Sequence, residues 1–448
     1  MAYKNLNAIN IVNVINAQVN KEYNTSLPAV NKANFSGMAD QLRVAAPNIQ
    51  NAWQDALVNL VGMQLTKTKR AYESYFRKLH LGETATENIQ LMMADLVAAR
   101  TFNPNADSED FFEDAKLDLG VQYVTSTVKA VFPVSINEET LYAAFLSPET
   151  FMGYFNNMVD SQLVSSLEMF DTQTVKQLIS QNVSEGNIFL IPMTKPVDQT
   201  TALAFTAQLK AVAADMAVEM SPKYNLAGFN TWTPKDEGVI IADTDTQAVT
   251  QTYSLAWAFN KSYVDWEGEG NAITMANDSI CDGAVFALYA DRYAFEIRNK
   301  VGFPKTVSQY FGNTLTLKRW LHYQAIYAVS YFNNIVGFAD SSKIDSSASA
   351  TLALRDGSTA VNPGAKGQVY VSALTVTSGK VFDKFGTYTI TGATDTKTAI
   401  DAKAGKLVIG KNETGSDVSG LTGKYITVTW TSHLDANTTA TLNIKINQ

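Results

Sequence analysis

The amino-acid composition of this chain changes abruptly near residue 340. The first 340 residues hold all 12 methionines and the single cysteine, whereas the last 108 hold 18 threonines and only 6 of the 47 aromatic residues. Two such compositions in one chain of 448 residues predict two kinds of domain. The run 341–350 between them is mostly small and polar, which predicts a solvated linker.

The tail after this run has the pattern of an antiparallel β domain. Its runs of alternating or β-branched residues are separated by Gly, Lys and Asp turns at short intervals. An Ig-like sandwich over 351–448 is the expected fold. With one cysteine in the chain, it would fold without an internal disulfide. The predicted strands are 369–377, 387–391, 407–409, 425–431 and 439–446.

A long amphipathic helix is the clearest element of the first 340 residues. Ser147 supplies an N-cap hydroxyl, Pro148 suits the first helical position, and Glu149 places an acid in the first turn. Apolar residues then recur three or four positions apart, which predicts a helix over 148–183 with one buried stripe. The fold class is predicted to be α+β, because helical patterns at 49–65 and 202–220 accompany strand-like runs at 121–136 and 238–242 and an aromatic closing segment at 315–338.

The segment from Gly82 to Gly120 is a long excursion between buried elements. It contains an amphipathic piece at 89–99 and a polar, acidic loop at 103–114. Excursions of this length are uncommon inside a compact domain. We therefore expect the segment to pack on another molecule.

Charge and hydropathy exclude several classes of protein. The chain has 35 basic and 43 acidic residues, a net charge of -8, whereas tight binding to phosphate backbones needs a positive surface. Its apolar runs are all interrupted well before 18 residues, so no membrane span is predicted. The first thirty residues are Asn-rich and lack the pattern of a secretion signal. We expect the chain to fold in a reducing cytosol.

Residues that could carry chemistry are scattered along the chain. His80, His322 and His433 lie in unrelated segments, and the sequence contains no HExxH, CxxC or GxSxG pattern. We therefore predict no catalytic residue, no cofactor site and no metal site, and we do not expect an enzyme. The run 420–424 ends in Gly-Lys but lacks the spacing of a phosphate-binding loop, and we interpret it as a hairpin turn.

Two acidic groups and one basic group remain as weaker candidates. Asp265, Glu267 and Glu269 could offer oxygen ligands to a divalent cation, although a solvated loop is favoured. Asp243 and Asp245 follow a predicted buried strand without a partner base, which favours a plain turn at the strand end. The basic group could contact nucleic acid or another subunit, and the acidity of the chain favours a subunit; its members, with interleaved aromatic residues, are Lys67, Lys69, Arg70, Tyr72, Tyr75, Phe76, Arg77 and Lys78.

Several segments, taken in order, resemble the major head proteins of the phi-29-like small podoviruses. That family has the Hong Kong 97-type capsid fold followed by a bacterial Ig-like (group 2) domain. The resemblance runs from about residue 48 to the end of the chain. The segments that carry it are 51–62, 75–89, 128–136, 141–145, 147–151, 239–245, 255–260 and 318–330 in the first part and 398–409 and 426–432 in the tail.

The resemblance implies a division of the chain into named parts. A capsid-fold domain would span 1–340, a linker 341–350 and an Ig-like group 2 domain 351–448. The N-terminal arm would become ordered only on assembly, and the extended loop would lie over a neighbouring subunit. Within the capsid fold, the implied parts are an N-terminal arm and helix at about 1–65, the extended loop at 75–130, a peripheral domain at 131–194 and 300–340 with the spine helix 148–183, and an axial domain at 195–299.

The resemblance also implies a function and partners. The chain would be a structural subunit of an icosahedral tailed-phage head, made in the host bacterial cytoplasm and found in the virion. Its main partner would be itself, in pentamers and hexamers. A scaffolding protein, a portal, and head-fibre or neck proteins would be further partners, and packaged double-stranded DNA would be touched only weakly. No membrane contact and no cofactor are expected.

Two other readings stay open from the sequence. A cell-surface binding protein could use the Ig-like domain as an adhesive module, but it would need a secretion signal or a wall anchor. An encapsulin-like compartment shell would share the capsid fold without usually having the Ig-like tail.

Overall fold

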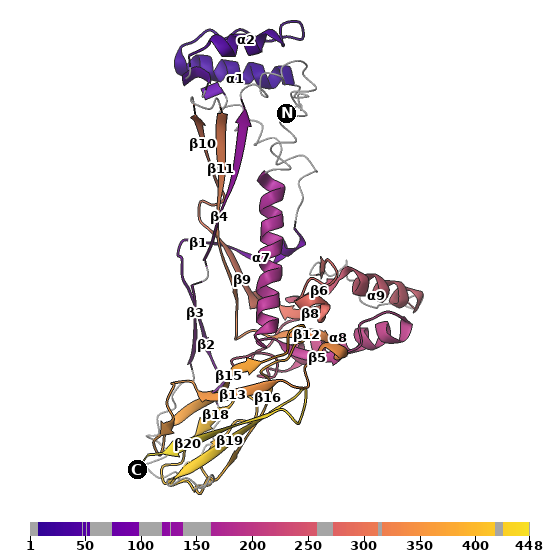
Figure 1. The fold of residues 1–448 in the computed structure, drawn as a ribbon, viewed down its shortest axis with the longest axis vertical. Helices are drawn as coiled ribbons and strands as arrows, with labels where there is room; N and C mark the ends of the chain where they lie inside the picture. The colour runs from indigo at the N-terminus through magenta and orange to yellow at the C-terminus, as the bar shows by residue number, and fades with distance from the viewer. Residues whose placement is uncertain are drawn as a thin grey trace, which may run out of the picture.

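The structure is a computed structural model, which describes residues 8–46, 48–50, 52–53, 74–97, 119–125, 127–137, 163–257, 272–311, 316–416 and 424–447. The molecule is elongated, with a helical N-terminal unit at one end and the Thr-rich tail at the other (Figure 1). Helix α7 (Ser165–Ser184) runs along the long axis beside a long sheet, and a lobe with two helices projects to one side.

The long sheet is built around β11 (Thr316–Val329), a strand of 14 residues. This strand pairs antiparallel with three others, and its length comes from the apolar and aromatic run that predicted a closing core segment. The remaining strands of this sheet are β1 (His80–Thr84), β4 (Thr127–Asn137), β9 (Phe295–Lys300) and β10 (Lys305–Phe311).

The second sheet forms the centre of the body, and its middle strand is β8 (Val285–Asp291), which is buried along its whole length. Val285 and Leu288 pack into the core that includes α7, whereas Phe286 and Tyr289 pack into the core that includes α8. Helices on both faces thus explain a continuous apolar strand. The strand order is β5 (Phe189–Met193), β12 (Ile335–Asp340), β8, β6 (Gly238–Asp243) and β7 (Ala272–Met275).

This sheet crosses a predicted domain boundary. β5 and β12 lie in the predicted peripheral parts 131–194 and 300–340, yet both pair in one sheet with strands of the predicted axial part 195–299. The predicted parts thus share one sheet, and their boundaries stay a prediction. Sequence order alone did not indicate this pairing, because it joins residues that are far apart along the chain.

The predicted helices fall partly on described residues. The second part of the helix predicted at 148–183 is α7, which ends at Ser184, while 148–162 lie outside the described residues. The helix predicted at 202–220 is α8 (Gln199–Val218). It begins three residues early because Asp198 and Thr201 form a capping box. α9 (Thr244–Trp257) packs beside it. Most of 49–65 and all of 103–114 lie outside the described residues.

The tail consists of two four-stranded sheets that enclose their own apolar core around Trp430. All five predicted strand runs are strands, and the Ig-like assignment itself stays a prediction. One sheet has the order β13 (Ser349–Leu354), β15 (Lys366–Thr375), β18 (Lys406–Val408), β17 (Ala399–Ile400); the other has β14 (Ala360–Val361), β20 (Thr439–Ile446), β19 (Tyr425–Ser432), β16 (Gly386–Thr391).

The run 341–350 is solvent-exposed at its serines, as expected, but it is also tied into the fold at Asp345. Asp345 is 1% exposed and its carboxylate accepts hydrogen bonds from Ser347 N at 3.0 Å and Thr377 N at 2.6 Å. Ile344 packs against the cores on both sides, and β13 already begins at Ser349. The serines of this run face water, whereas the buried carboxylate of Asp345 satisfies two backbone N–H groups.

Residues 8–46 of the Asn-rich N-terminal segment are folded onto themselves. Its helices are α1 (Ala8–Tyr23) and α2 (Gly37–Val44). Along α1, the amides of Asn13 and Asn20 each form two hydrogen bonds with the backbone of one residue, Val30 and Leu27 respectively. Each asparagine amide thus bonds both the N–H and the C=O of one residue in the segment that follows α1, as a neighbouring strand would. These contacts account for the asparagines along α1.

Candidate assembly site

A hairpin of two strands, β2 (Ile89–Ala94) and β3 (Leu119–Val124), lies in the predicted extended loop and runs beside the body towards the tail (Figure 1). The amphipathic pattern noted at 89–99 is therefore a strand with alternating burial.

The outer face of the hairpin is apolar and exposed. Met92 and Val121 are directly opposite each other in the ladder, and their side chains are 63% and 42% exposed. Tyr123 and Leu119 continue the same face and are exposed as well. Adjacent apolar side chains in water mark a surface that another molecule covers.

The inner face of the hairpin fits closely against the body. Gly120 is buried, and a Cβ atom there would lie 2.5 Å from Cε1 of Phe332 and 2.7 Å from Cζ of Phe229. The side chain of Gln122 donates to Val329 O at 2.9 Å and accepts from Tyr331 N at 2.9 Å. The hairpin thus docks with its backbone close to two aromatic rings, which only a glycine allows.

Asp95, just after β2, ties the hairpin to both the body and the tail. Its Oδ1 accepts hydrogen bonds from Asn230 N at 3.1 Å and Nδ2 at 2.9 Å, and its Oδ2 pairs with Lys406 of the tail. Partial burial alone would raise the pKa of this carboxyl, but the hydrogen bonds from Lys406 and Asn230 lower it to about 2. Asp95 is therefore ionised at neutral pH, and the pair holds three parts of the chain together.

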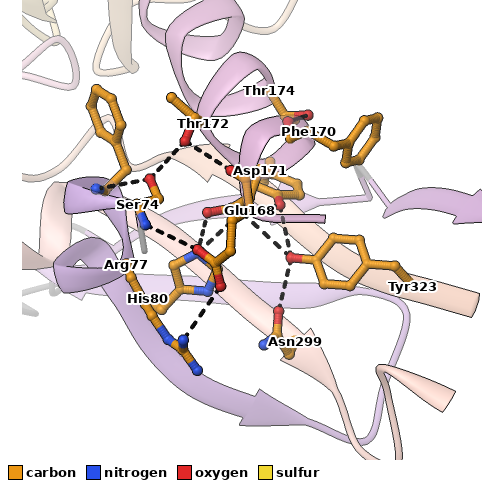
Figure 2. A network of polar contacts seen from close by, with 12 residues as sticks. Ser74, Arg77, His80, Glu168, Phe170, Asp171, Thr172, Thr174, Asn299 and Tyr323 are labelled. Atoms are coloured by element: carbon orange, nitrogen blue, oxygen red, sulfur yellow. Dashed lines mark hydrogen bonds and ion pairs between the residues drawn. The ribbon is translucent and has the colours of Figure 1, made fainter. Parts of the chain in front are cut away.

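At the base of the hairpin, polar side chains from four elements meet below α7 (Figure 2). Asp171, 5% exposed, lies with both carboxylate oxygens 3.1 Å from His80 Nε2. Tyr327 donates its hydroxyl to the same carboxylate, and the hydroxyls of Tyr323 and Tyr327 are 2.8 Å apart. Tyr323 also donates to Asn299 Oδ1 at 3.0 Å.

Burial, and then the nearby charge of Asp171, raise the pKa of both Tyr323 and Tyr327 far above the ordinary range of a phenol. Both hydroxyls thus stay protonated and serve as donors. A buried carboxylate with an imidazole and a phenol as partners is stable only while all of them are in place. The network therefore ties the start of β1 to α7 and β11.

A second carboxylate of α7 completes this base. Glu168 accepts hydrogen bonds from Ser74 N at 3.1 Å and from Arg77 Nη1 at 3.3 Å. Ser74 caps the short helix η1 (Tyr75–Leu79) by accepting from Phe76 N at 3.2 Å, and its hydroxyl lies 2.7 Å from Thr172 Oγ1. Arg77, predicted as part of a subunit contact, is thus used within the chain.

The histidines predicted to be unrelated are placed differently from one another. His80 joins the network above, His322 lies in the middle of β11, and His433 stacks on Phe189 with ring centroids 4.3 Å apart. His433 also lies 2.8 Å from the fully buried Asp383. The sequence offered a signal for the pair formed by His80 and Asp171. Asp171 interrupts the apolar stripe of α7 between Leu167 and Val175. A charge on a buried stripe needs a partner.

The strand-end acid Asp243 is buried and pairs with Lys195 at 3.2 Å, while Asp245 lies in the first turn of α9. Burial raises the pKa of Asp243 to about 6, against the opposing effect of Lys195. Lys78 donates to Ala272 O at 3.3 Å. The candidates outside the described residues are Lys67, Lys69, Arg70, Tyr72, Asp265, Glu267, Glu269 and most of the run 420–424.

The described part of the chain has neither a metal-binding cluster nor a membrane-spanning helix. Among those residues, no group of three or more His, Cys, Asp or Glu side chains could hold a metal ion. No helix that the structure describes has the length and apolar character needed to cross a membrane.

Comparisons with known proteins identify the class. A chain in the capsid structure of Staphylococcus phage Andhra aligns with a TM-score of 0.50 and 11% identity, over 61% of this chain and 86% of that one. This likeness shows that the fold is that of a phage capsid subunit. The major capsid protein of Bacillus phage GA-1 is 25% identical over 359 residues, which cover 76% of this chain and 71% of that protein.

The family described as Phi29-like phage major capsid protein matches residues 12–339. This chain therefore belongs to the Phi29-like phage major capsid protein family. It is a structural subunit of a bacteriophage shell and is located in the capsid of the virion. The predicted α+β capsid fold and the predicted role as a structural subunit of a phage shell are thereby confirmed, and the Ig-like tail stays a prediction.

Proposed function

We propose that copies of this chain close into an icosahedral head shell, as pentamers and hexamers, around packaged double-stranded DNA. The observation that carries the proposal is the outer face of the β2–β3 hairpin, where Met92 and Val121 are exposed side by side in a capsid-family chain. A second copy packed on this face would remove its apolar surface from water, at about 25 cal/mol per Å² buried.

A division of labour along the chain is part of this proposal. The segment 75–130 serves as the extended loop that lies over a neighbour, and 195–299 with β5 and β12 serves as the axial part. Residues 351–448 form an Ig-like group 2 domain on the outside of the shell, in contact with neighbours or the host surface. The family match, which ends at residue 339, supports a boundary close to the change of composition.

The proposed partners follow from the same role. Assembly in the host bacterial cytoplasm involves a scaffolding protein, and a portal with head-fibre or neck proteins joins the finished shell. The net charge of -8 supports only weak contact with packaged DNA. A chain with this role needs no catalytic site.

The test is assembly of the full chain, expressed alone and together with a scaffolding protein, and followed by sedimentation and negative-stain electron microscopy. We expect closed shells or regular sheets from the natural sequence. The double substitution Met92→Glu, Val121→Lys should leave soluble, folded subunits that no longer assemble. Val408→Lys, an exposed apolar position of the tail, is the matched control and should assemble normally. Normal shells from the hairpin variant would refute the assigned contact, and a soluble monomer under all conditions would refute the proposal.

A further inference from the structure

A cavity of about 680 Å³ lies where the tail meets the body. The body contributes one wall, which includes Asn187, Phe189 and Tyr331, and the tail contributes the other from β15, from the start of β16 and from the turn before β18. Its volume falls in the range of pockets that hold small organic ligands, about 300–1,000 Å³. Both parts of the chain are needed to form it.

Buried contacts between the tail and the body fix the shape of the cavity. Asp383, which is fully buried, accepts hydrogen bonds from Leu190 N of the body at 2.7 Å and from Phe385 N at 3.1 Å. The ring of His433 stacks on the ring of Phe189. The ring of Phe385 packs edge-on against the ring of Phe189, with centroids 5.3 Å apart. Because these contacts are formed without a ligand, binding would require little further ordering of the cavity side chains.

The charge of the cavity is opposite to that of the chain. Its lining includes four cationic side chains, Lys223, Arg355, Lys384 and Lys403, against the single carboxylate of Glu185, in a chain with a net charge of -8. Lys223 is already paired with Asp215 at 3.3 Å.

Lys384 and Arg355 are each hydrogen-bonded to a neutral amide oxygen. Lys384 donates to Asn187 Oδ1 at 2.9 Å, and Arg355 donates to Gln368 Oε1. Burial lowers the pKa of Lys384, with Glu185 opposing that effect, so the ammonium group lacks the solvation it has in water. An anion beside the ammonium group would replace the favourable interaction with water that burial removes.

Aromatic surface accompanies these cations. Phe189, Tyr331, Phe385 and Tyr388 all line the cavity. Flat apolar rings beside charged donors suit a ligand that has both a ring and an anionic group. Arg and Lys together are the usual partners of phosphate.

We propose that this cavity binds a small sugar phosphate, with the phosphate group on Lys384 and Arg355 and the sugar ring against the aromatic wall. The site is independent of the assembly face on the hairpin. Because the ligand would contact both walls, its binding stabilises the docking of the tail on the body.

Isothermal titration calorimetry on the full chain tests the proposal, with glucose 6-phosphate, glucose, glucuronate and inorganic phosphate as probes. We expect saturable binding of glucose 6-phosphate, weaker binding of phosphate alone and none of glucose. Saturable binding of glucuronate equal to that of glucose 6-phosphate would overturn the assignment of a phosphate and leave a site for sugar carboxylates.

Two variants and a control locate the binding. Arg355→Ala and Lys384→Ala should each weaken binding of glucose 6-phosphate by about tenfold or more. Arg355 is exposed, so its variant is expected to fold as the natural chain does. Lys380→Ala, an exposed lysine of the tail outside the cavity, should bind unchanged. Unchanged binding in both cavity variants, no binding of any probe, or saturable binding of an acidic peptide in place of the sugar phosphate would each overturn the proposal.

Discussion

The buried carboxylate of Asp383 allows a quantitative test of how the tail is fixed to the body. β5 is the edge strand of the central sheet, so the N–H of Leu190 points away from the strand ladder. Asp383 supplies its acceptor at 2.7 Å, accepts from Phe385 N at 3.1 Å, and lies 2.8 Å from His433 Nε2. One side chain therefore satisfies three donors at the junction.

Substituting Asp383→Ala would leave these donors buried without a partner. An unsatisfied buried donor costs about 1–3 kcal/mol, and the substitution would leave up to three such donors without an acceptor. Because these contributions overlap, we expect a total loss of about 3–5 kcal/mol in the free energy of docking. The junction should open before the tail itself unfolds, since the tail has its own core.

The assay combines urea unfolding with limited proteolysis of the full chain, and it follows cleavage in the run 341–350. Asp356→Ala is the matched control, because Asp356 is exposed and its carboxylate accepts from Ser358 N within a turn. We expect faster cleavage in the Asp383 variant only. A loss below about 1 kcal/mol, or a loss equal to that of the control, would refute the reasoning.

Three further outcomes are expected. Gly120→Val should detach the hairpin, because its side chain would overlap the rings of Phe229 and Phe332; hydrogen exchange of the hairpin amides should rise, and unchanged protection would contradict the docking. Asn20→Ala should destabilise the N-terminal unit by about 1 kcal/mol and expose the amide of Leu27 to exchange, and an unaltered exchange rate would count against the asparagine contact. The pKa of Asp243 is raised from 3.8 to about 6, so its contribution to stability is full below pH 4 and is lost as the pH rises through 6. Asp243→Asn should remove up to about 3 kcal/mol of pH dependence between pH 4 and 6.5 in urea titrations, and an unaltered slope would show that burial does not control this carboxyl.

Local patterns were sufficient where a side chain's position depends on its near neighbours in sequence. In β19 (Tyr425–Ser432) buried residues alternate with half-exposed ones, because successive side chains of a strand point to opposite faces. The same logic located β6 and most of α8. It also located β2 within the amphipathic piece 89–99 and β3 at the start of the strand-like run 121–136, although their pairing was not predicted.

These local patterns could not predict contacts between residues far apart in the sequence. His80 and Asp171 are 91 residues apart, and His433 and Asp383 are 50 residues apart, yet both pairs are formed inside the fold. Neither histidine lies in a motif that would announce its partner. The run 341–350 shows the same limit, since its serines are exposed as in a linker but Asp345 is buried and accepts from Thr377 N, 32 residues further along the chain.

The sequence by itself thus determined the fold class, the family and the position of most helices and strands, because periodicity, turn residues and composition are properties of short stretches of chain. Only the tertiary structure decided which buried charges are paired, that β5 and β12 share a sheet with β8, and that body and tail together enclose a cationic cavity. Those features depend on the close approach of residues far apart in the chain, as between Leu190 and Asp383, which are 193 apart, and between Asp95 and Lys406, which are 311 apart. Such an approach is an outcome of the whole packed chain.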